Sequence, residues 1–313
     1  MILAASLAVT MAEKLEMTEG GAEELEDLRA LAWAELGNAY RVADDLASAE
    51  AALAYALDVS SLGTDDPLLL ARIMDLTASL YTDQRRFEEA CLLLDWVYAI
   101  YLEAGDQHLA GRALISKGVS AGLAFKSEEA MNLLARGLCL TDPSRDPKVT
   151  LVAVHGLLWF LVDCGRVAEV KELLPRVRAL YEVYAERLFK LRALWLEGRV
   201  AAGLGENPHA ERAFLCARQA FLDAEQPYDT ALVSLDLAAV WLRQGKTAEI
   251  KDLVDEVVAI FRVRHIRREA IAALLMLKTA LRKDQATAAL LQAVAAELRR
   301  LEGLPARQSQ VSG

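Results

Sequence analysis

Histidine and cysteine supply many metal ligands and nucleophiles in proteins, and their spacing in this chain favours neither role. No histidine has a second histidine or cysteine one helical turn away, so the sequence holds no zinc-binding pair of the HExxH kind. No two cysteines form a C-x-x-C pair, and no serine, cysteine or lysine stands in a recognisable nucleophile motif. The residues concerned are His108, His155, His209, His265, Cys91, Cys139, Cys164 and Cys216. We therefore predict a non-enzymatic protein without a metal ion or cofactor, and we expect the thiols to be reduced and buried in apolar helices.

Composition and charge favour a helical protein of the cytoplasm. The chain of 313 residues is 54% hydrophobic, and alanine, leucine, glutamate and arginine, all strong helix formers, dominate it. Its formal net charge of −10 argues against nucleic acid as the main partner. The longest interior apolar run, 149–162, is too short to span a bilayer, and no basic residue precedes the apolar N-terminus as in a signal peptide. We expect a cytoplasmic location and no membrane association.

Glycines that stand 40 residues apart reveal an internal repeat. They are Gly165, Gly205 and Gly245, and an apolar anchor residue follows each by five positions. The same step gives the full set of anchors, Ala49, Ala90, Ala130, Val170, Ala210 and Ile250, with Ala49 one residue out of step. A larger apolar residue stands four positions after each anchor: Leu53, Leu94, Leu134, Leu174, Phe214 and Val254. A fixed period of about 20–50 residues is typical of stacked supersecondary units, so we predict one elongated array.

Each repeat is predicted to contain two helices. The predicted first helices are 23–42, 66–83, 106–123, 147–164, 186–204, 228–243 and 266–282, and the second helices are 46–62, 86–104, 127–140, 167–184, 208–225, 247–263 and 285–302. Pro175 falls inside one second helix, where we expect a kink or break near Leu174. The predicted organisation is an N-terminal helix (2–17) and short linker in 1–22, the array in 23–302 and a disordered tail in 303–313.

The first repeat carries a recognisable pattern, Trp33-x2-Leu36-Gly37-x2-Tyr40, followed by Ala49-x3-Leu53 and Ala56. This pattern resembles the tetratricopeptide repeat, in which a small residue lets the second helix approach closely. Gly118 and Gly198 stand at the same position as Gly37 in later repeats. The usual spacing is about 34 residues, so the chain is most similar to long-helix variants in large bacterial regulators; HEAT-type repeats are the alternative. The resemblance implies an all-α, right-handed superhelical α-solenoid of about seven helix-turn-helix repeats.

The resemblance also implies a ligand groove, because first helices line the concave face of tetratricopeptide arrays. The family's contact positions fall on Asn38, Arg41, Arg72, Asp75, Arg112, His155, Trp159, Arg192, Trp195, Arg199, Asp236 and Arg243. Arginine guanidinium groups suit carboxylates, including a peptide C-terminus. Two interpretations stay open at this point. The arginines bind a ligand, or they pair with acids on the adjacent helix; the two tryptophans face the groove or the core, and His155 borders a pocket or is buried.

The leading hypothesis is a scaffold that binds a protein or peptide segment, acidic or ending in a free carboxylate, in this groove. One alternative is the sensor or oligomerisation part of a bacterial transcriptional regulator. A second is self-assembly into a homo-oligomer through the terminal repeats, where we expect Leu290, Leu291 and Val294 to be partly uncovered. The basic cluster at 262–268 leaves a nucleic-acid contact open, although a solvated turn is the commoner meaning of such a cluster.

Overall fold

The computed structural model describes residues 1–15, 21–183, 187–264 and 266–302. These residues form fifteen α-helices and no strand, and successive helices pack against one another as hairpins, so the predicted all-α solenoid is confirmed. The predicted tail, 303–313, lies outside the described residues. No helix in the described ranges is both long enough and apolar enough to cross a bilayer.

The helices follow the predicted two-helix period. An N-terminal helix, α1 (Ile2–Lys14), comes first. The first helices of the hairpins are α2 (Ala22–Val42), α4 (Pro67–Asp83), α6 (Gln107–Leu123), α8 (Pro147–Asp163), α10 (Arg187–Gly203), α12 (Pro227–Arg243) and α14 (Arg268–Arg282). The second helices are α3 (Leu46–Ser60), α5 (Phe87–Glu103), α7 (Ser127–Leu140), α9 (Val167–Val183), α11 (Asn207–Asp223), α13 (Thr247–Val263) and α15 (Ala288–Leu301). Every end agrees with its predicted range to within three residues.

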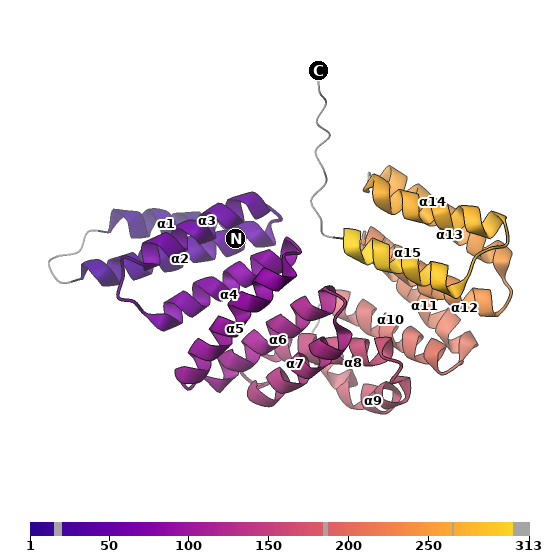
Figure 1. Cartoon of the computed structure of the whole chain (residues 1–313), viewed down its shortest axis with the longest axis horizontal. Coiled ribbons are helices and arrows are strands. Elements are labelled where there is room, and N and C mark those ends of the chain that lie inside the picture. Colours follow the sequence, from indigo (N-terminus) through magenta and orange to yellow (C-terminus); the bar gives the residue numbers. More distant parts are fainter. Residues whose placement is uncertain (16–20, 184–186, 265, 303–313) are drawn as a thin grey trace, which may run out of the picture. The chain divides into compact units, whose positions relative to one another are not determined.

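The contacts between helices divide the chain into two compact units, Met1–Phe160 (unit 1) and Leu161–Gly313 (unit 2). The boundary falls inside α8. In unit 1 each helix from α1 to α7 packs against the next, and α4 also contacts the first helices on either side, α2 and α6 (Figure 1). In unit 2 the same neighbour-to-neighbour packing runs from α9 to α15.

The six anchor residues lie in the core, and all of them are 0% exposed. Leu53, Leu94, Leu134, Phe214 and Val254, four positions further on, are at most 2% exposed. Glycine on the first helix makes room for three of these side chains. A Cβ atom on Gly37, Gly118 or Gly198 would lie 2.7, 2.9 or 2.6 Å from Leu53, Leu134 or Phe214. The close approach that the glycine pattern predicts is therefore confirmed.

The turn inside each hairpin repeats one backbone conformation. Gly165, Gly205 and Gly245 have φ of +76°, +77° and +75°. The equivalent residues of other hairpins, Asp44, Arg85, Phe125 and Asp284, also have positive φ. A non-glycine residue costs about 1–2 kcal/mol in this left-handed region. The glycine spacing in the sequence therefore marks a turn that every one of these hairpins makes, with or without glycine.

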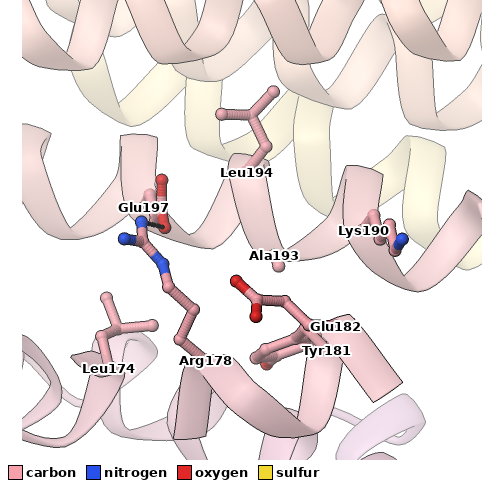
Figure 2. Close-up of a pocket in the computed structure, with 8 residues that line it drawn as sticks. All are labelled: Leu174, Arg178, Tyr181, Glu182, Lys190, Ala193, Leu194 and Glu197. Carbon is pink, nitrogen blue, oxygen red and sulfur yellow. Dashed lines mark hydrogen bonds and ion pairs between the residues drawn. The ribbon is translucent and has the colours of Figure 1, made fainter. Parts of the chain in front are cut away.

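Helix α9 departs from the pattern. It runs unbroken through Pro175, so the expected break near Leu174 is wrong. Leu174 itself is only half-buried, unlike its equivalents in the other repeats. It lines a cavity of about 240 Å³ between α9 and α10, together with residues of both helices (Figure 2). Helix α9 is thus continuous at Pro175, and the departure from the regular repeat is the incomplete packing of Leu174 against α10.

The last hairpin reverses the order of its neighbours. Helix α14 packs against α13, and α15 packs against α12, so a second helix takes the place beside α12 that a further first helix would fill (Figure 1). Leu291 and Val294 of α15 are 2% and 1% exposed. The expectation of partial exposure is therefore wrong for Leu291 and Val294, because α12 and α14 cover them, and it is confirmed for Leu290, which is half-buried.

The cysteines also differ from expectation. All four are free, but Cys139, Cys164 and Cys216 are exposed and Cys91 is half-buried. Cys139 and Cys216 lie on second helices, α7 and α11, on faces turned away from the anchors. An apolar sequence context did not imply burial here, because each second helix buries only the side that packs against its neighbours.

Candidate functional site

Unit 1 brings five predicted contact residues together on α2, α4 and α6, namely Asn38, Arg41, Arg72, Asp75 and Arg112. Their arginines are already paired. Arg72 Nη2 lies 2.7 Å from Glu35 Oε1, and Arg41 Nη1 lies 2.7 Å from Asp83 Oδ2. The side chain of Arg41 also donates to Asn38 Oδ1 at 3.0 and 3.2 Å. Both ion pairs join α2 to α4, so these arginines hold adjacent first helices together.

Asp75 is the acid at the centre of this group. Burial raises the pKa of its carboxyl group, and Arg112, Arg72 and Arg41 lower it by a smaller amount. Burial and the Asp75 charge also raise the pKa of Tyr101, on α5, which is 6% exposed. The three arginines lie near enough to act on Asp75, yet each makes its ion pair with a different acid. Asp75 is thus a half-buried carboxylate without an ion pair among the described residues.

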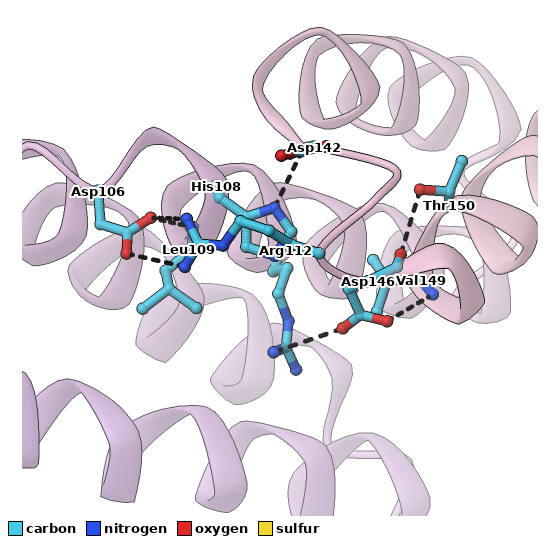
Figure 3. Close-up of polar contacts among 9 residues, drawn as sticks. Asp106, His108, Leu109, Arg112, Asp142, Asp146, Val149 and Thr150 are labelled. Atoms are coloured by element: carbon cyan, nitrogen blue, oxygen red, sulfur yellow. Dashed lines mark hydrogen bonds and ion pairs between the residues drawn. The ribbon is translucent and has the colours of Figure 1, made fainter.

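Arg112 belongs to a second network, which fastens the turn between α7 and α8 to α6 (Figure 3). Arg112 Nη1 lies 3.5 Å from Asp146 Oδ2, while Asp146 Oδ1 accepts a hydrogen bond of 3.1 Å from the Val149 amide at the start of α8. The Asp142 amide donates to Nδ1 of the buried His108 at 3.0 Å. The network has a structural purpose, because it fixes an irregular turn against a first helix.

His155 and Trp159 lie one turn apart on α8, and both are half-buried. Their ring centroids are 5.9 Å apart, with the ring planes tilted by 40°. The two rings therefore contact each other in unit 1. Part of each ring stays accessible at the surface of α8.

Unit 2 places Arg192, Arg199, Asp236 and Arg243 on α10 and α12. Arg199 Nη2 lies 2.6 Å from Asp163 Oδ1, and its Nε lies 3.7 Å from Asp236 Oδ2. Arg192 Nη2 lies 4.0 Å from Asp229, whose carboxyl pKa is raised by burial and lowered less by Arg192. Arg243 differs from the others because its hydrogen-bond acceptors are neutral oxygens, Ala202 O at 3.4 Å and Asn207 Oδ1 at 3.3 Å.

Trp195 is not available to a ligand in this structure. It is 3% exposed, and its ring meets Phe221 edge-on at a centroid distance of 5.8 Å. Its indole N–H donates to Asp236 Oδ2 at 2.7 Å. The groove interpretation is therefore corrected for Trp195: its ring is part of the core, and its N–H orients the carboxylate that Arg199 also contacts.

A cavity of about 340 Å³ lies beside Arg199 and Asp236 in unit 2. Its apolar lining comes from Val162, Leu235, Ala239, Leu291 and Ala295, and its polar lining from Asp163, Arg199, Asp236, Gln292 and Arg299. Arg199 contacts both aspartates, with its side chain only 13% exposed. Arg299 makes no hydrogen bond or ion pair with any residue that the structure describes. The formal charges of the lining therefore cancel, two aspartates against two arginines, but the guanidinium of Arg299 is held by none of the described acids.

Sequence reasoning missed Asp163, Gln292 and Arg299. Gln292 and Arg299 escaped because they lie on α15, a second helix that packs against α12 only in the folded chain. Asp163 could have been found, since it is the family's last contact position on α8 and was passed over. Among the described residues no cluster of three or more histidines, cysteines or acids could hold a metal ion.

No protein-family model matches the chain, and no curated protein matches its sequence. Among solved structures, the chain is similar to a Rap protein complexed with competence and sporulation factor, with a TM-score of 0.65 and 13% sequence identity. That match covers 96% of this chain and 84% of the Rap protein. A likeness to BtubC (BKLC) from P. vanneervenii, at 17% identity over 84% of this chain and 91% of that one, has a TM-score of only 0.39 and carries no argument. The likeness to the Rap protein shows a shared helical-repeat fold.

Proposed function

We propose that this chain is a non-enzymatic binding module, a long-helix tetratricopeptide array that holds a segment of a peptide or protein partner. The fold supports this proposal, because stacked repeats present long surfaces that suit extended ligands. The similar Rap protein was solved in complex with competence and sporulation factor, which supports a binding role for this architecture.

The observation that carries the proposal is the guanidinium of Arg299, which lines the unit 2 cavity and makes no hydrogen bond or ion pair with a described residue. A cavity of about 340 Å³ lies at the lower end of the roughly 300–1,000 Å³ usual for small-ligand sites. It would admit the last one or two residues of a peptide. The terminal side chain would contact Leu235, Leu291 and Ala295, and the terminal carboxylate would pair with Arg299 and accept a hydrogen bond from Gln292.

The six arginines that the sequence predicts as ligand contacts are less suited to bind a carboxylate of the partner. Five of the six predicted arginines already face an acid within 4.0 Å. A ligand carboxylate would have to displace those partners, whereas Arg299 needs no displacement. The proposed preference for a free carboxylate therefore rests on Arg299. The alternative of a regulator's sensor part would use the same cavity and stays a hypothesis.

The test is binding of short peptides with free C-termini, compared with the same peptides amidated at the C-terminus. A hydrogen bond to a charged group contributes about 1.5–3 kcal/mol, so we expect Arg299→Ala to weaken binding about 10- to 100-fold. The matched control is Arg300→Ala, because Arg300 is exposed and pairs with Glu297 on the same helix. Equal binding of acid and amide forms, or unchanged binding to Arg299→Ala, would reject the proposal.

A further inference from the structure

The cavity between α9 and α10 is a second pocket, separate from the one beneath α15. It lies where the repeat pattern fails, at the only one of the six post-anchor residues that is not buried, Leu174. Leu174, Ala193, Leu194 and the ring of Tyr181 supply apolar surface. Tyr181 is 6% exposed, and burial together with the nearby Glu197 charge raises the pKa of its hydroxyl group. The cavity between α9 and α10 therefore has an apolar lining at the place where the post-anchor side chain is buried in the other repeats.

Four charged side chains surround this apolar lining, and only two of them pair with each other. Arg178 Nη2 lies 2.9 Å from Glu197 Oε1, so these two neutralise each other at one edge of the cavity. Glu182, on α9, and Lys190, on α10, make no hydrogen bond or ion pair with any described residue. Figure 2 shows the Glu182 carboxylate directed into the space between the helices, with Lys190 further along the opposite helix. The cavity thus has one acidic and one basic group on opposite helices, and neither is paired with a residue that the structure describes.

We propose that this cavity binds a small zwitterion with an apolar side chain, namely a free aliphatic α-amino acid. Its ammonium group pairs with Glu182, its carboxylate pairs with Lys190, and its side chain covers Leu174 and Leu194. The cavity volume of about 240 Å³ fits this class of ligand. At roughly 30 Å³ per water it holds about eight waters, which is close to the number of non-hydrogen atoms in free leucine. A drug-sized ligand needs at least about 300 Å³.

Affinity should be modest because Glu182 and Lys190 are both exposed and their ion pairs with a ligand are screened by water. We expect a Kd of about 0.1–1 mM for L-leucine. This proposal is independent of the proposed peptide-binding function, because it uses α9 and α10 and none of the residues that line the cavity beneath α15. Failure of either leaves the other untouched.

The test is isothermal titration of the full chain with L-leucine, glycine, leucinamide and N-acetyl-leucine. Leucine should bind, while glycine lacks the apolar side chain, leucinamide the carboxylate and N-acetyl-leucine the ammonium group, so each should bind at least about tenfold more weakly. Glu182→Gln and Lys190→Gln should cause similar losses without lowering the Tm. Glu172→Gln, also an exposed acid of α9 but outside the cavity, is the control and should bind like wild type. Absence of leucine binding at about 10 mM, equal binding of either blocked analogue, or unchanged binding by both cavity variants would overturn the proposal.

Discussion

Helices α10 and α11 approach closely at Gly198, so an added methyl group at this position should lower the stability of unit 2. A Cβ atom at this position would lie 2.6 Å from Cε1 and 2.7 Å from Cδ1 of Phe214, and carbon atoms normally pack at about 3.5–4.0 Å. The ring would have to move by about 1 Å in a fully buried site. Overpacking of this kind costs about 1–3 kcal/mol, while alanine gains about 1 kcal/mol in helix propensity over glycine. We expect Gly198→Ala to destabilise unit 2 by about 1 kcal/mol.

A second substitution tests the cause. Phe214→Leu should rescue Gly198→Ala, because the double variant recreates the alanine–leucine pair that Ala78 and Leu94 form in an earlier repeat. Double-mutant cycles from thermal unfolding should give a coupling energy of about 1 kcal/mol, or about 2–4 °C in Tm.

Gly205→Ala is the control for this cycle. It lies at φ +77° with nothing within 4 Å of an added Cβ, so it should cost about 1 kcal/mol through its backbone alone and show no coupling to Phe214→Leu. A Gly198→Ala variant that is more stable than wild type, or a cycle without coupling, would refute the packing argument.

Three further predictions concern polar groups. His108→Ala should cost about 1–3 kcal/mol, because it leaves the Asp142 amide without its acceptor, and a Tm equal to wild type would contradict this. Hydrogen bonds from Lys246 and Trp241 lower the pKa of Glu211, so its stabilising effect is full above the unfolded pKa of about 4.3 and is lost as pH falls through the lower folded value. The Tm gap between wild type and Glu211→Gln should close over that window, and a gap that does not change with pH would contradict this. Burial raises the pKa of Asp75, so its charged form costs stability at pH 7; Asp75→Asn should raise the Tm there and lose this advantage on acidification, and a lower Tm at pH 7 would count against an unpaired carboxylate.

The sequence was sufficient to predict the helices because each of them has a periodic and local cause. Anchors such as Ala49 and Ala210 are buried, and Gly37 and Gly198 admit the opposite helix, as the pattern indicates. These are contacts between neighbours in the chain, which a fixed period specifies. Pro175 was harder to judge, since tertiary packing determined that α9 continues through it.

The candidate site was less predictable because it depends on contacts that the period does not encode. Helix α15 packs against α12 and brings Gln292 and Arg299 to a cavity beside Arg199. In the regular hairpins a second helix contacts the first helices next to it in the chain, so a regular array would have left α15 against α14 and away from α12. Nothing in the spacing of residues 285–302 distinguishes these two arrangements, since both bury the same apolar stripe of Leu291, Val294 and Leu298.

The sequence pattern also left open whether the predicted arginines bind a ligand or pair with acids of the chain. Arg72 stands at a position that binds ligands in the tetratricopeptide family, and so does Arg199. Whether such an arginine is available depends on the acids one repeat away, here Glu35 for Arg72 and Asp163 for Arg199. These acids lie 36 or 37 residues from their partners, which is about one helical turn less than the 40-residue period. Searching for acids at that separation would have identified the pairs before the structure.

This pairing changes what selectivity the two units can have. A row of free arginines would attract any acidic segment, with strong dependence on salt and little preference for position. Arginines neutralised within the fold lose that general attraction and serve to align the first helices. A single group that makes no ion pair with a described residue, such as Arg299 in its cavity or Asp75 near three arginines, then contributes more to discrimination between ligands. A partner lacking the complementary group would leave a partly buried charge unpaired, which costs more free energy than a lost surface ion pair. Selectivity in this chain should therefore depend on one or two positions and change little when Arg41 or Arg72 is replaced.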